Sequence, residues 1–243
     1  MQPLSREKLK DVRKLGSRKH RLETGRFVCE GIKLVGESDC TEYIVVSESF
    51  RGAIPDNVPC YHLIDSLFND IAQTATPQGI LAVCKQKAAL EVADISGVDA
   101  VLMCDAVTDP GNLGTMIRTA ENAGIGAVVL SEGCVDVYNA KVVRATMGAI
   151  FRVPIVVGAD LAGVLREGGW RGIAMLSDGD ADIYDVDMRG RVALVVGSEA
   201  HGVSEAVKLA CEVRARIPMS GGESLNAGVA AGVAVYEWRR QTR

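Results

Sequence analysis

The sequence predicts an α/β protein with a small N-terminal domain followed by a larger, doubly wound domain. Predicted helices and strands alternate along the whole chain, which favours mostly parallel sheets covered by helices. The 243 residues are enough for two modest domains, and a stretch of charged and small residues at 87–98 indicates a linker. We therefore expect one domain at 1–86 and a second domain at 99–243.

The N-terminal domain is expected to consist of short elements. A charged helix begins near Ser5 and is ended by Gly16, and short apolar runs follow it. The expected helices are 5–15, 31–38 and 65–74, and the expected strands are 27–29, 43–46 and 80–84. This pattern is that of a small α/β domain.

The alternation becomes stronger from Asp99 onward. The expected strands are 100–104, 126–130, 153–157, 173–177, 192–196 and 213–217, and the expected helices are 113–123, 139–147, 160–167, 203–210 and 224–238. In doubly wound sheets a ligand lies beyond the carboxyl ends of the strands. We therefore expect the loops 105–112, 197–202 and 218–224 to face one crevice.

The charge of the chain is unevenly distributed. The net charge is −4, from 27 basic and 31 acidic side chains. Residues 1–36 hold ten of the basic and four of the acidic side chains, which leaves 17 and 27 for the rest of the chain. A basic segment suits a phosphate backbone, although a solvated helix face is the alternative interpretation. The side chains expected to bind RNA are Arg13, Lys14, Arg18, Lys19, Arg21 and Arg26.

Several classes of protein are disfavoured by missing patterns. No apolar run is long enough to cross a membrane and the start lacks a signal peptide, so we expect a cytoplasmic protein without membrane contact. The seven cysteines form no C-x-x-C pair, which argues against a disulfide framework and a bound metal, and Cys104 and Cys211 are expected in the core. Neither G-x-G-x-x-G nor a P-loop occurs, which argues against a nicotinamide enzyme and a P-loop NTPase. His201 is the only histidine in a candidate loop, and no G-x-S-x-G accompanies it, so a serine-type hydrolase is not expected.

Three motifs occupy the three candidate loops. They are N-x5-R-T-A at 112–120, G-x-E-x-x-G at 197–202 and S-L-N-A at 224–227. In order and spacing, this set resembles the SpoU-like (TrmH-type) RNA ribose 2′-O-methyltransferases of the SPOUT superfamily. Residues 147–154 resemble the segment between the first two motifs of that family, and 27–35 and 76–82 are similar to the substrate-binding domain that precedes many of its members.

The resemblance implies a C-terminal trefoil knot whose loops bind S-adenosylmethionine. The residues implied to contact this cofactor are Leu176, Ser177, Asp178, Gly197, Glu199, Gly202, Ile217, Met219, Ser224 and Leu225. The residues implied to take part in catalysis are Asn112, Arg118, Glu199, Ser224 and Asn226.

The implied roles of these residues leave alternatives open. Family accounts give Arg118 the activation of the ribose hydroxyl, but an arginine with a pKa above about 12 is a poor base and could instead fix the target phosphate. A surface ion pair is the alternative role for this residue. The amides of Asn112 and Asn226 can orient a hydroxyl, Ser224 can also begin the last helix, and Glu199 can order its loop or act directly.

The expected function is S-adenosylmethionine-dependent 2′-O-methylation of a ribose in RNA, with ribosomal RNA favoured over tRNA by the two-domain organisation. The nearly all-apolar helix 224–238 suits a homodimer interface, as in the family, or a simple core. The alternatives are a tRNA methyltransferase, an RNA-binding or ribosome-assembly protein without catalysis, and a small-molecule α/β enzyme. The last would leave the basic segment 1–36 unexplained.

Overall fold

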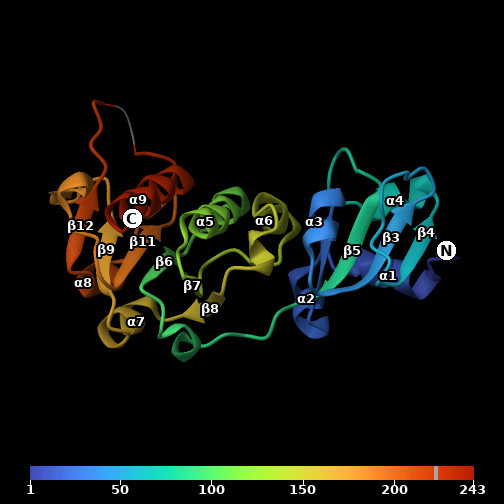
Figure 1. Cartoon of the computed structure of the whole chain (residues 1–243), viewed down its shortest axis with the longest axis horizontal. Coiled ribbons are helices and arrows are strands. Elements are labelled where there is room, and N and C mark those ends of the chain that lie inside the picture. The colour runs from blue at the N-terminus through green and yellow to red at the C-terminus, as the bar shows by residue number, and fades with distance from the viewer. Residues whose placement is uncertain (222–223) are drawn as a thin grey trace. The chain divides into compact units, whose positions relative to one another are not determined.

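The computed structural model describes residues 1–221 and 224–243. The chain folds into two compact units (Figure 1). Unit 1 comprises residues 1–88 together with 136–151, and unit 2 comprises residues 89–135 together with 152–243. Both units are built from strands and helices that alternate along the chain, so the expected α/β class is confirmed.

Unit 1 contains a five-stranded mixed sheet. Across the sheet the strands are β1 (Gln2–Pro3), β4 (Cys60–Leu63), β3 (Thr41–Ser47), β5 (Ile80–Lys85) and β2 (Arg26–Glu30). The helices are α1 (Arg6–Lys14), α2 (Arg18–Thr24), α3 (Ile32–Glu37), α4 (Asp65–Ile71), α6 (Ala140–Ala145) and the 3₁₀ helix η2 (Ala149–Phe151). Strand β3 is parallel to β4 and antiparallel to β5, which is also antiparallel to β2.

The core of unit 1 forms where α1 and α4 meet the sheet. Val12 of α1 and Phe68 of α4 are buried in one cluster with Val45 and Leu81. Helix α1 begins as expected, because the Ser5 hydroxyl accepts a hydrogen bond from the Lys8 N–H, 3.2 Å away. Burial of these apolar side chains stabilises the helices, which are too short to persist alone in water.

Four elements of unit 1 were not expected from the sequence. They are β1, β4, α2 and η2, which have two, four, seven and three residues. Helix α2 buries only one side chain, so it carries no periodic apolar pattern, and it ends at Gly25, which adopts a left-handed conformation with φ 62°. The expected helix 65–74 is shorter in the structure, because Ala72 is already extended.

Residues 136–151 are a part of unit 1 that is distant in sequence from the rest. The Phe27 ring lies 4.7 Å from that of Tyr138 and 6.5 Å from that of Phe151, measured between ring centroids. The Tyr138 hydroxyl also accepts a hydrogen bond of 3.1 Å from the Lys87 N–H. Helix α6 packs against β2. The core of unit 1 is therefore completed by a segment that follows residue 135.

Unit 2 contains a seven-stranded parallel sheet. Across the sheet the strands are β10 (Ala181–Asp182), β12 (Val213–Arg216), β9 (Arg171–Met175), β11 (Val192–Gly197), β6 (Ala100–Asp105), β7 (Ala127–Ser131) and β8 (Ile155–Ala159). The helices are α5 (Pro110–Ala123), α7 (Leu161–Glu167), α8 (Glu205–Ala210), α9 (Ala227–Gln241) and the 3₁₀ helices η1 (Val92–Ile95) and η3 (Ile183–Asp185). The doubly wound sheet expected from the sequence is thereby confirmed, with β6 and β11 buried along their whole length.

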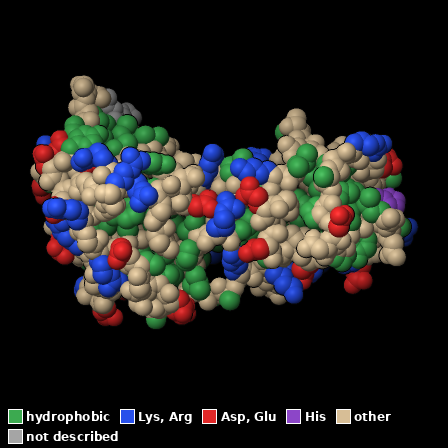
Figure 2. Space-filling model, in the orientation of Figure 1, with side chains coloured by type: hydrophobic (Ala, Val, Ile, Leu, Met, Phe, Trp, Pro, Cys, Tyr) green, Lys and Arg blue, Asp and Glu red, His purple; other side chains and the backbone are tan. Residues whose placement is uncertain are grey.

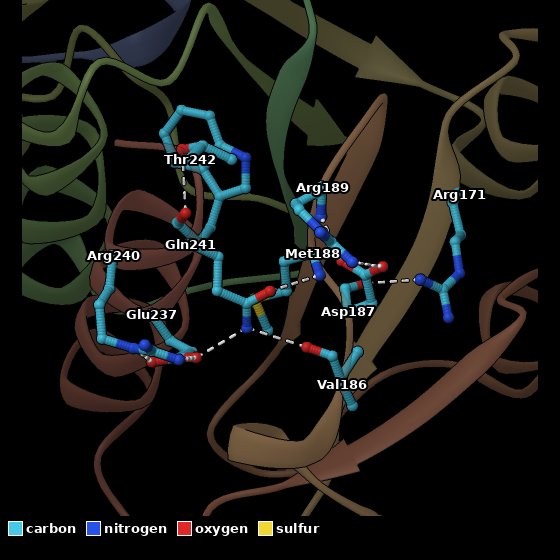
Figure 3. A network of polar contacts seen from close by, with 10 residues as sticks. Arg171, Val186, Asp187, Met188, Arg189, Glu237, Arg240, Gln241 and Thr242 are labelled. Atoms are coloured by element: carbon cyan, nitrogen blue, oxygen red, sulfur yellow. Dashed lines mark hydrogen bonds and ion pairs between the residues drawn. The ribbon is translucent and has the colours of Figure 1, made fainter.

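The C-terminal end of α9 holds the segment that precedes β11. Figure 3 shows the Gln241 amide between the main chains of Val186 and Met188. Its Nε2 donates to the Val186 carbonyl, and its Oε1 accepts from the Met188 N–H, at 2.9 and 2.8 Å. Glu237, which is buried, accepts from Gln241 and from Arg240, and the Arg240 guanidinium lowers the pKa of that carboxyl group. The Gln241 side chain thus makes the hydrogen bonds that a neighbouring strand would otherwise make with the main chain of Val186 and Met188.

Candidate active site

The carboxyl ends of three adjacent strands of unit 2, β12, β9 and β11, surround a hollow of 510 Å³, and the expected loop 105–112 is not part of its wall. Its wall is made by 175–178 after β9, 196–203 after β11, and residues between β12 and α9. All ten residues expected to contact the cofactor lie in this wall: Leu176, Ser177, Asp178, Gly197, Glu199, Gly202, Ile217, Met219, Ser224 and Leu225. The structure therefore brings together residues that are up to 49 positions apart in the sequence.

The loop after β11 folds back tightly at Gly197. Ser198 and Gly202 exchange two main-chain hydrogen bonds, of 3.1 and 2.9 Å, and Gly202 has a φ of 66°. A Cβ atom on Gly197 would lie only 1.9 Å from the carbonyl carbon of Gly202. Only glycine fits at position 197, because main chain occupies the space that a side chain would need.

Three of the expected catalytic side chains form a hydrogen-bonded chain. The Asn226 Nδ2 donates to Asn112 Oδ1 at 3.0 Å, and the Asn112 Nδ2 donates to Glu199 Oε1 at 2.6 Å. The Asn226 Oδ1 accepts from the Val229 N–H at 3.2 Å, which fixes the orientation of that amide. Because each amide must then donate in one direction, the chain ends on the Glu199 carboxylate as an acceptor.

Local helix starts place both asparagines. Asp109 caps α5 by accepting a hydrogen bond of 2.8 Å from the Asn112 N–H, and Pro110 occupies the first turn. The loop expected at 105–112 therefore ends earlier, and Asn112 lies in the first turn of α5. Asn226, rather than Ser224, is the N-cap of α9, because its side chain reaches the Val229 N–H. The N-cap role predicted for Ser224 is corrected accordingly.

Arg118 lies on the exposed side of α5, outside the wall of the hollow. It follows Asn112 by six residues, which is about 9 Å along a helix axis. Within the described ranges 1–221 and 224–243, its guanidinium has no hydrogen-bond or ion-pair partner. The ion-pair alternative for Arg118 therefore has no support among those residues, none of which occupies a donor of its guanidinium.

Among the wall residues that were not expected in the site, two have basic side chains. Lys208 of α8 lines the hollow while its Nζ pairs with Glu205 at 2.7 Å, and His201 lines it from the loop after β11. No motif marks Lys208, because only the packing of α8 brings it there. For His201 the signal was its place inside G-x-E-x-x-G.

The thiols of unit 2 are poorly suited to nucleophilic chemistry. Burial raises the pKa of the Cys104 thiol well above its ordinary value, and burial raises that of Cys211 to about 12. Cys104 is fully buried, as expected for a core residue, whereas Cys211 is only half-buried. Among the described residues, no group of three or more His, Cys, Asp and Glu side chains is arranged to hold a metal ion.

The basic residues at the start of the chain differ in their exposure. Arg13, Lys14, Arg18 and Lys19 are exposed on α1 and α2. Arg26 is half-buried and pairs with Asp11 at 3.1 Å and with Glu42 at 3.8 Å.

Arg21 corrects the prediction made for it. Its side chain is only 5% exposed, and its guanidinium donates to Asp136 at 2.6 Å and to the carbonyls of Leu15 and Gly16 at 2.8 and 3.0 Å. These bonds satisfy the guanidinium inside unit 1, so Arg21 has a structural role and is not available to RNA.

No helix in the described part of the chain is long and apolar enough to cross a bilayer.

Comparison with known proteins places the chain in a family. The model of the SpoU rRNA Methylase family matches residues 99–236, and that of the MRM3-like substrate binding domain matches residues 6–82. The chain is 36% identical, over 96% of both sequences, to the 23S rRNA (guanosine(2553)-2'-O)-methyltransferase RlmP of Bacillus subtilis.

Solved structures agree with this placement. A putative RNA methyltransferase of the TrmH family from Porphyromonas gingivalis superposes with a TM-score of 0.86 at 34% identity, covering 98% of this chain and 99% of that one. An AdoMet-bound rRNA methyltransferase from Sinorhizobium meliloti gives 0.86 at 29% identity, covering 99% and 97%. The chain belongs to the SpoU rRNA methylase family.

Proposed function

We propose that the protein is an enzyme that transfers the methyl group of S-adenosylmethionine to a ribose 2′-hydroxyl of ribosomal RNA. The observation that carries this proposal is the hollow of unit 2, whose wall joins all ten predicted cofactor residues and includes two members of the Asn226–Asn112–Glu199 chain. The B. subtilis relative, named a 23S rRNA methyltransferase and similar over nearly its whole length, supports ribosomal RNA as the substrate.

The residues of the hollow fit S-adenosylmethionine. Leu176, Ile217 and Leu225 offer apolar surface to an adenine ring, and the volume of 510 Å³ is typical of small-ligand sites. The carboxylates of Asp178 and Glu199 lie in the same wall and can offset the positive charge of the cofactor. Bound there, S-adenosylmethionine supplies an electrophilic methyl group attached to a positively charged sulfur.

The protein side chains position the ribose and stabilise charge. We assign to Arg118 a bidentate contact with the target phosphate and stabilisation of charge as the hydroxyl proton leaves. Asn112 and Asn226 have fixed amide orientations, so they can hold the ribose hydroxyl in one direction at little entropic cost. Glu199 orders its loop and the Asn112 amide, and Ser224 contributes a hydroxyl to the wall.

RNA binding is assigned to the N-terminal part of the chain. We propose a substrate-binding domain at 1–86, a linker at 87–98 and a methyltransferase domain at 99–243, in line with the two family matches. Arg13, Lys14, Arg18 and Lys19 would contact phosphates, with a smaller contribution from Arg26. On the face seen in Figure 2, Lys and Arg side chains are scattered among acidic ones, so charge alone does not outline the RNA path.

Further parts of the proposal concern assembly and topology. Val229 and Tyr236 of α9 are both 52% exposed, which suits a homodimer in which a second copy covers this helix. A trefoil knot in the C-terminal part is proposed from family membership, with the close approach of Gly179 to the main chain of Ala215 as support. We also propose that methyl transfer needs no metal and takes place in the cytoplasm.

Transfer of a labelled methyl group tests the proposed function. Incubation of the full chain with labelled S-adenosylmethionine and a 23S rRNA transcript should label the RNA in a dinucleotide that resists alkaline hydrolysis, since a 2′-O-methyl group blocks strand cleavage. A parallel reaction with tRNA tests the alternative substrate. Cofactor binding without label in either RNA would instead indicate an RNA-binding or assembly protein.

A further inference from the structure

A second hollow, of 370 Å³, lies in unit 1 and is separate from the cofactor site. Its wall consists of the loop that follows β3, the start of α4 and the loop that precedes β5. The side chains of this wall that could contact a ligand are those of Ser49, Phe50, Arg51, Asp65, Asn69 and Gln78. Apart from Phe68, which also lines the hollow and packs in the core of unit 1, the side chains of this wall have no role among those described so far.

The polar groups of this hollow have fixed orientations. Gln78 Oε1 accepts from the Ile32 N–H at 2.8 Å, so its Nε2 is left as a donor. Asp65 Oδ1 accepts from the N–H and the hydroxyl of Ser49 at 3.1 and 2.9 Å. The Asp65 carboxylate also interacts with Ser47 and Arg51, whereas the Asn69 amide has no hydrogen-bond partner among the described residues. The hollow thus combines at least one donor and one acceptor with an amide that can serve as both.

An aromatic ring and a guanidinium complete the wall. The ring of Phe50 is half-buried and lies against Gly52, where a Cβ atom would be 2.5 Å from the ring edge. Gly79, with a φ of 78°, also keeps the space beside Phe50 open. Arg51 Nη1 donates to the carbonyls of Glu48 and Phe50 at 2.8 and 2.9 Å, which holds the guanidinium over the same loop.

We propose that this hollow binds an unpaired nucleobase of the RNA substrate, an inference that rests on the proposed function. Unpaired bases are recognised by stacking on aromatic or guanidinium planes and by hydrogen bonds to their edges, which alternate donors and acceptors. A phosphate group fits this wall less well, because the Ser49 hydrogen bonds lower the pKa of Asp65 and keep its carboxylate negative. The hollow would therefore read unpaired bases, whereas the basic helices α1 and α2 contact the backbone.

Two variants of the full chain test this proposal by RNA binding. Asn69→Ala removes an exposed amide without a described partner, and should weaken binding of a 23S rRNA transcript by about tenfold. Phe50→Leu keeps an apolar side chain but removes the stacking surface, and should weaken binding by at least about fivefold. Ser66→Ala, on the same helix as Asn69 but outside the hollow, is the matched control and should bind like the wild type.

The salt dependence separates a base contact from a phosphate contact. Because no counterion is released at a base, the affinity of Asn69→Ala should fall with salt at the same slope as that of the wild type. Its affinity for a fully double-stranded RNA should be unchanged. Thermal melts and titrations with S-adenosylmethionine test whether the variants are folded. If Phe50→Leu does not fold, the result for Asn69→Ala still decides the question.

The outcomes distinguish this proposal from the proposed function. Wild-type affinity of Asn69→Ala for the transcript, or a flattened salt slope, would overturn the base site. If the wild type methylates the transcript while the variants bind normally, only the base site fails. If the wild type transfers no methyl group but the variants still lose affinity for single-stranded RNA, the base site stands and the proposed reaction fails.

Discussion

Replacement of Gly197 by alanine tests the geometry of the cofactor hollow most directly. The added Cβ would lie 1.9 Å from the Gly202 carbonyl carbon and 2.1 Å from its oxygen, whereas non-bonded carbon atoms prefer about 3.5 Å or more. The loop must therefore open by more than about 1 Å, which breaks the two main-chain bonds between Ser198 and Gly202.

The cost of this change follows from those contacts. Two lost hydrogen bonds at about 1 kcal/mol each, with about 1–3 kcal/mol of backbone strain, give about 3–5 kcal/mol. For a chain of this size that corresponds to a fall in Tm of about 6–20 °C. Since the displaced loop forms part of the hollow, we also expect the affinity for S-adenosylmethionine to fall by at least about tenfold.

Thermal melts and calorimetric titration with S-adenosylmethionine measure both effects. Gly36→Ala is the control, because a Cβ atom there has no neighbour within 4 Å and alanine favours the helix α3. It should melt at or slightly above the wild-type temperature and bind the cofactor normally. A Gly197→Ala protein with wild-type Tm and cofactor affinity would refute the tight turn and the place of this loop in the hollow.

Three further predictions concern charged side chains. Arg118→Lys should lower kcat by on the order of a hundredfold in single-turnover methylation, because lysine keeps the charge but lacks the planar fork of the guanidinium. The Tm and the cofactor affinity should stay unchanged. Near-normal turnover would show that Arg118 is not part of the active site. Replacement of Arg13, Lys14, Arg18 and Lys19 by glutamine should weaken RNA binding and flatten its salt slope by up to about 0.9 per lost phosphate contact, and an unchanged slope would place the RNA elsewhere. Glu237→Gln should lower stability at pH 7 by about 1 kcal/mol, because Arg240 holds the pKa of the folded-state carboxyl below its unfolded value near about 4.3. The stability difference between the wild type and Glu237→Gln should be fully present at pH values above the pKa of the carboxyl in the unfolded state. It should shrink as the pH falls through the pKa of the carboxyl in the folded state. If thermal melts show the same difference at every pH, the charge of Glu237 is not its source.

The prediction of the fold succeeded where strands are fully buried. The runs that became β6 and β11 are continuously apolar and bounded by glycine and polar residues, so their limits were found within one residue. Strand β4 has only one buried residue of four, and β1 has none, because both depend on a neighbouring strand for their conformation. Local pattern carries no information about such a partner.

At the candidate site, too, the sequence pattern does not reveal contacts between side chains that are distant in sequence. Five of the ten predicted cofactor residues lie in the motifs, and the other five, Leu176, Ser177, Asp178, Ile217 and Met219, were implied by the family resemblance. Arg21 was assigned to RNA because a charge count does not reveal burial, and its partner Asp136 lies 115 residues away. The hydrogen bond between Asn112 and Asn226 depends on the packing of α5 against α9, which no sequence pattern specifies.

The inclusion of residues 136–151 in unit 1 has a consequence for synthesis of the chain on the ribosome. When residue 88 has been made, Phe27 lacks Tyr138 and Phe151, and the Arg21 guanidinium lacks the carboxylate of Asp136. At about 5–20 residues per second, the intervening 89–135 take about 2–10 s to be added. The N-terminal unit therefore keeps an apolar face and a charge uncovered until about a third of the second unit has been translated.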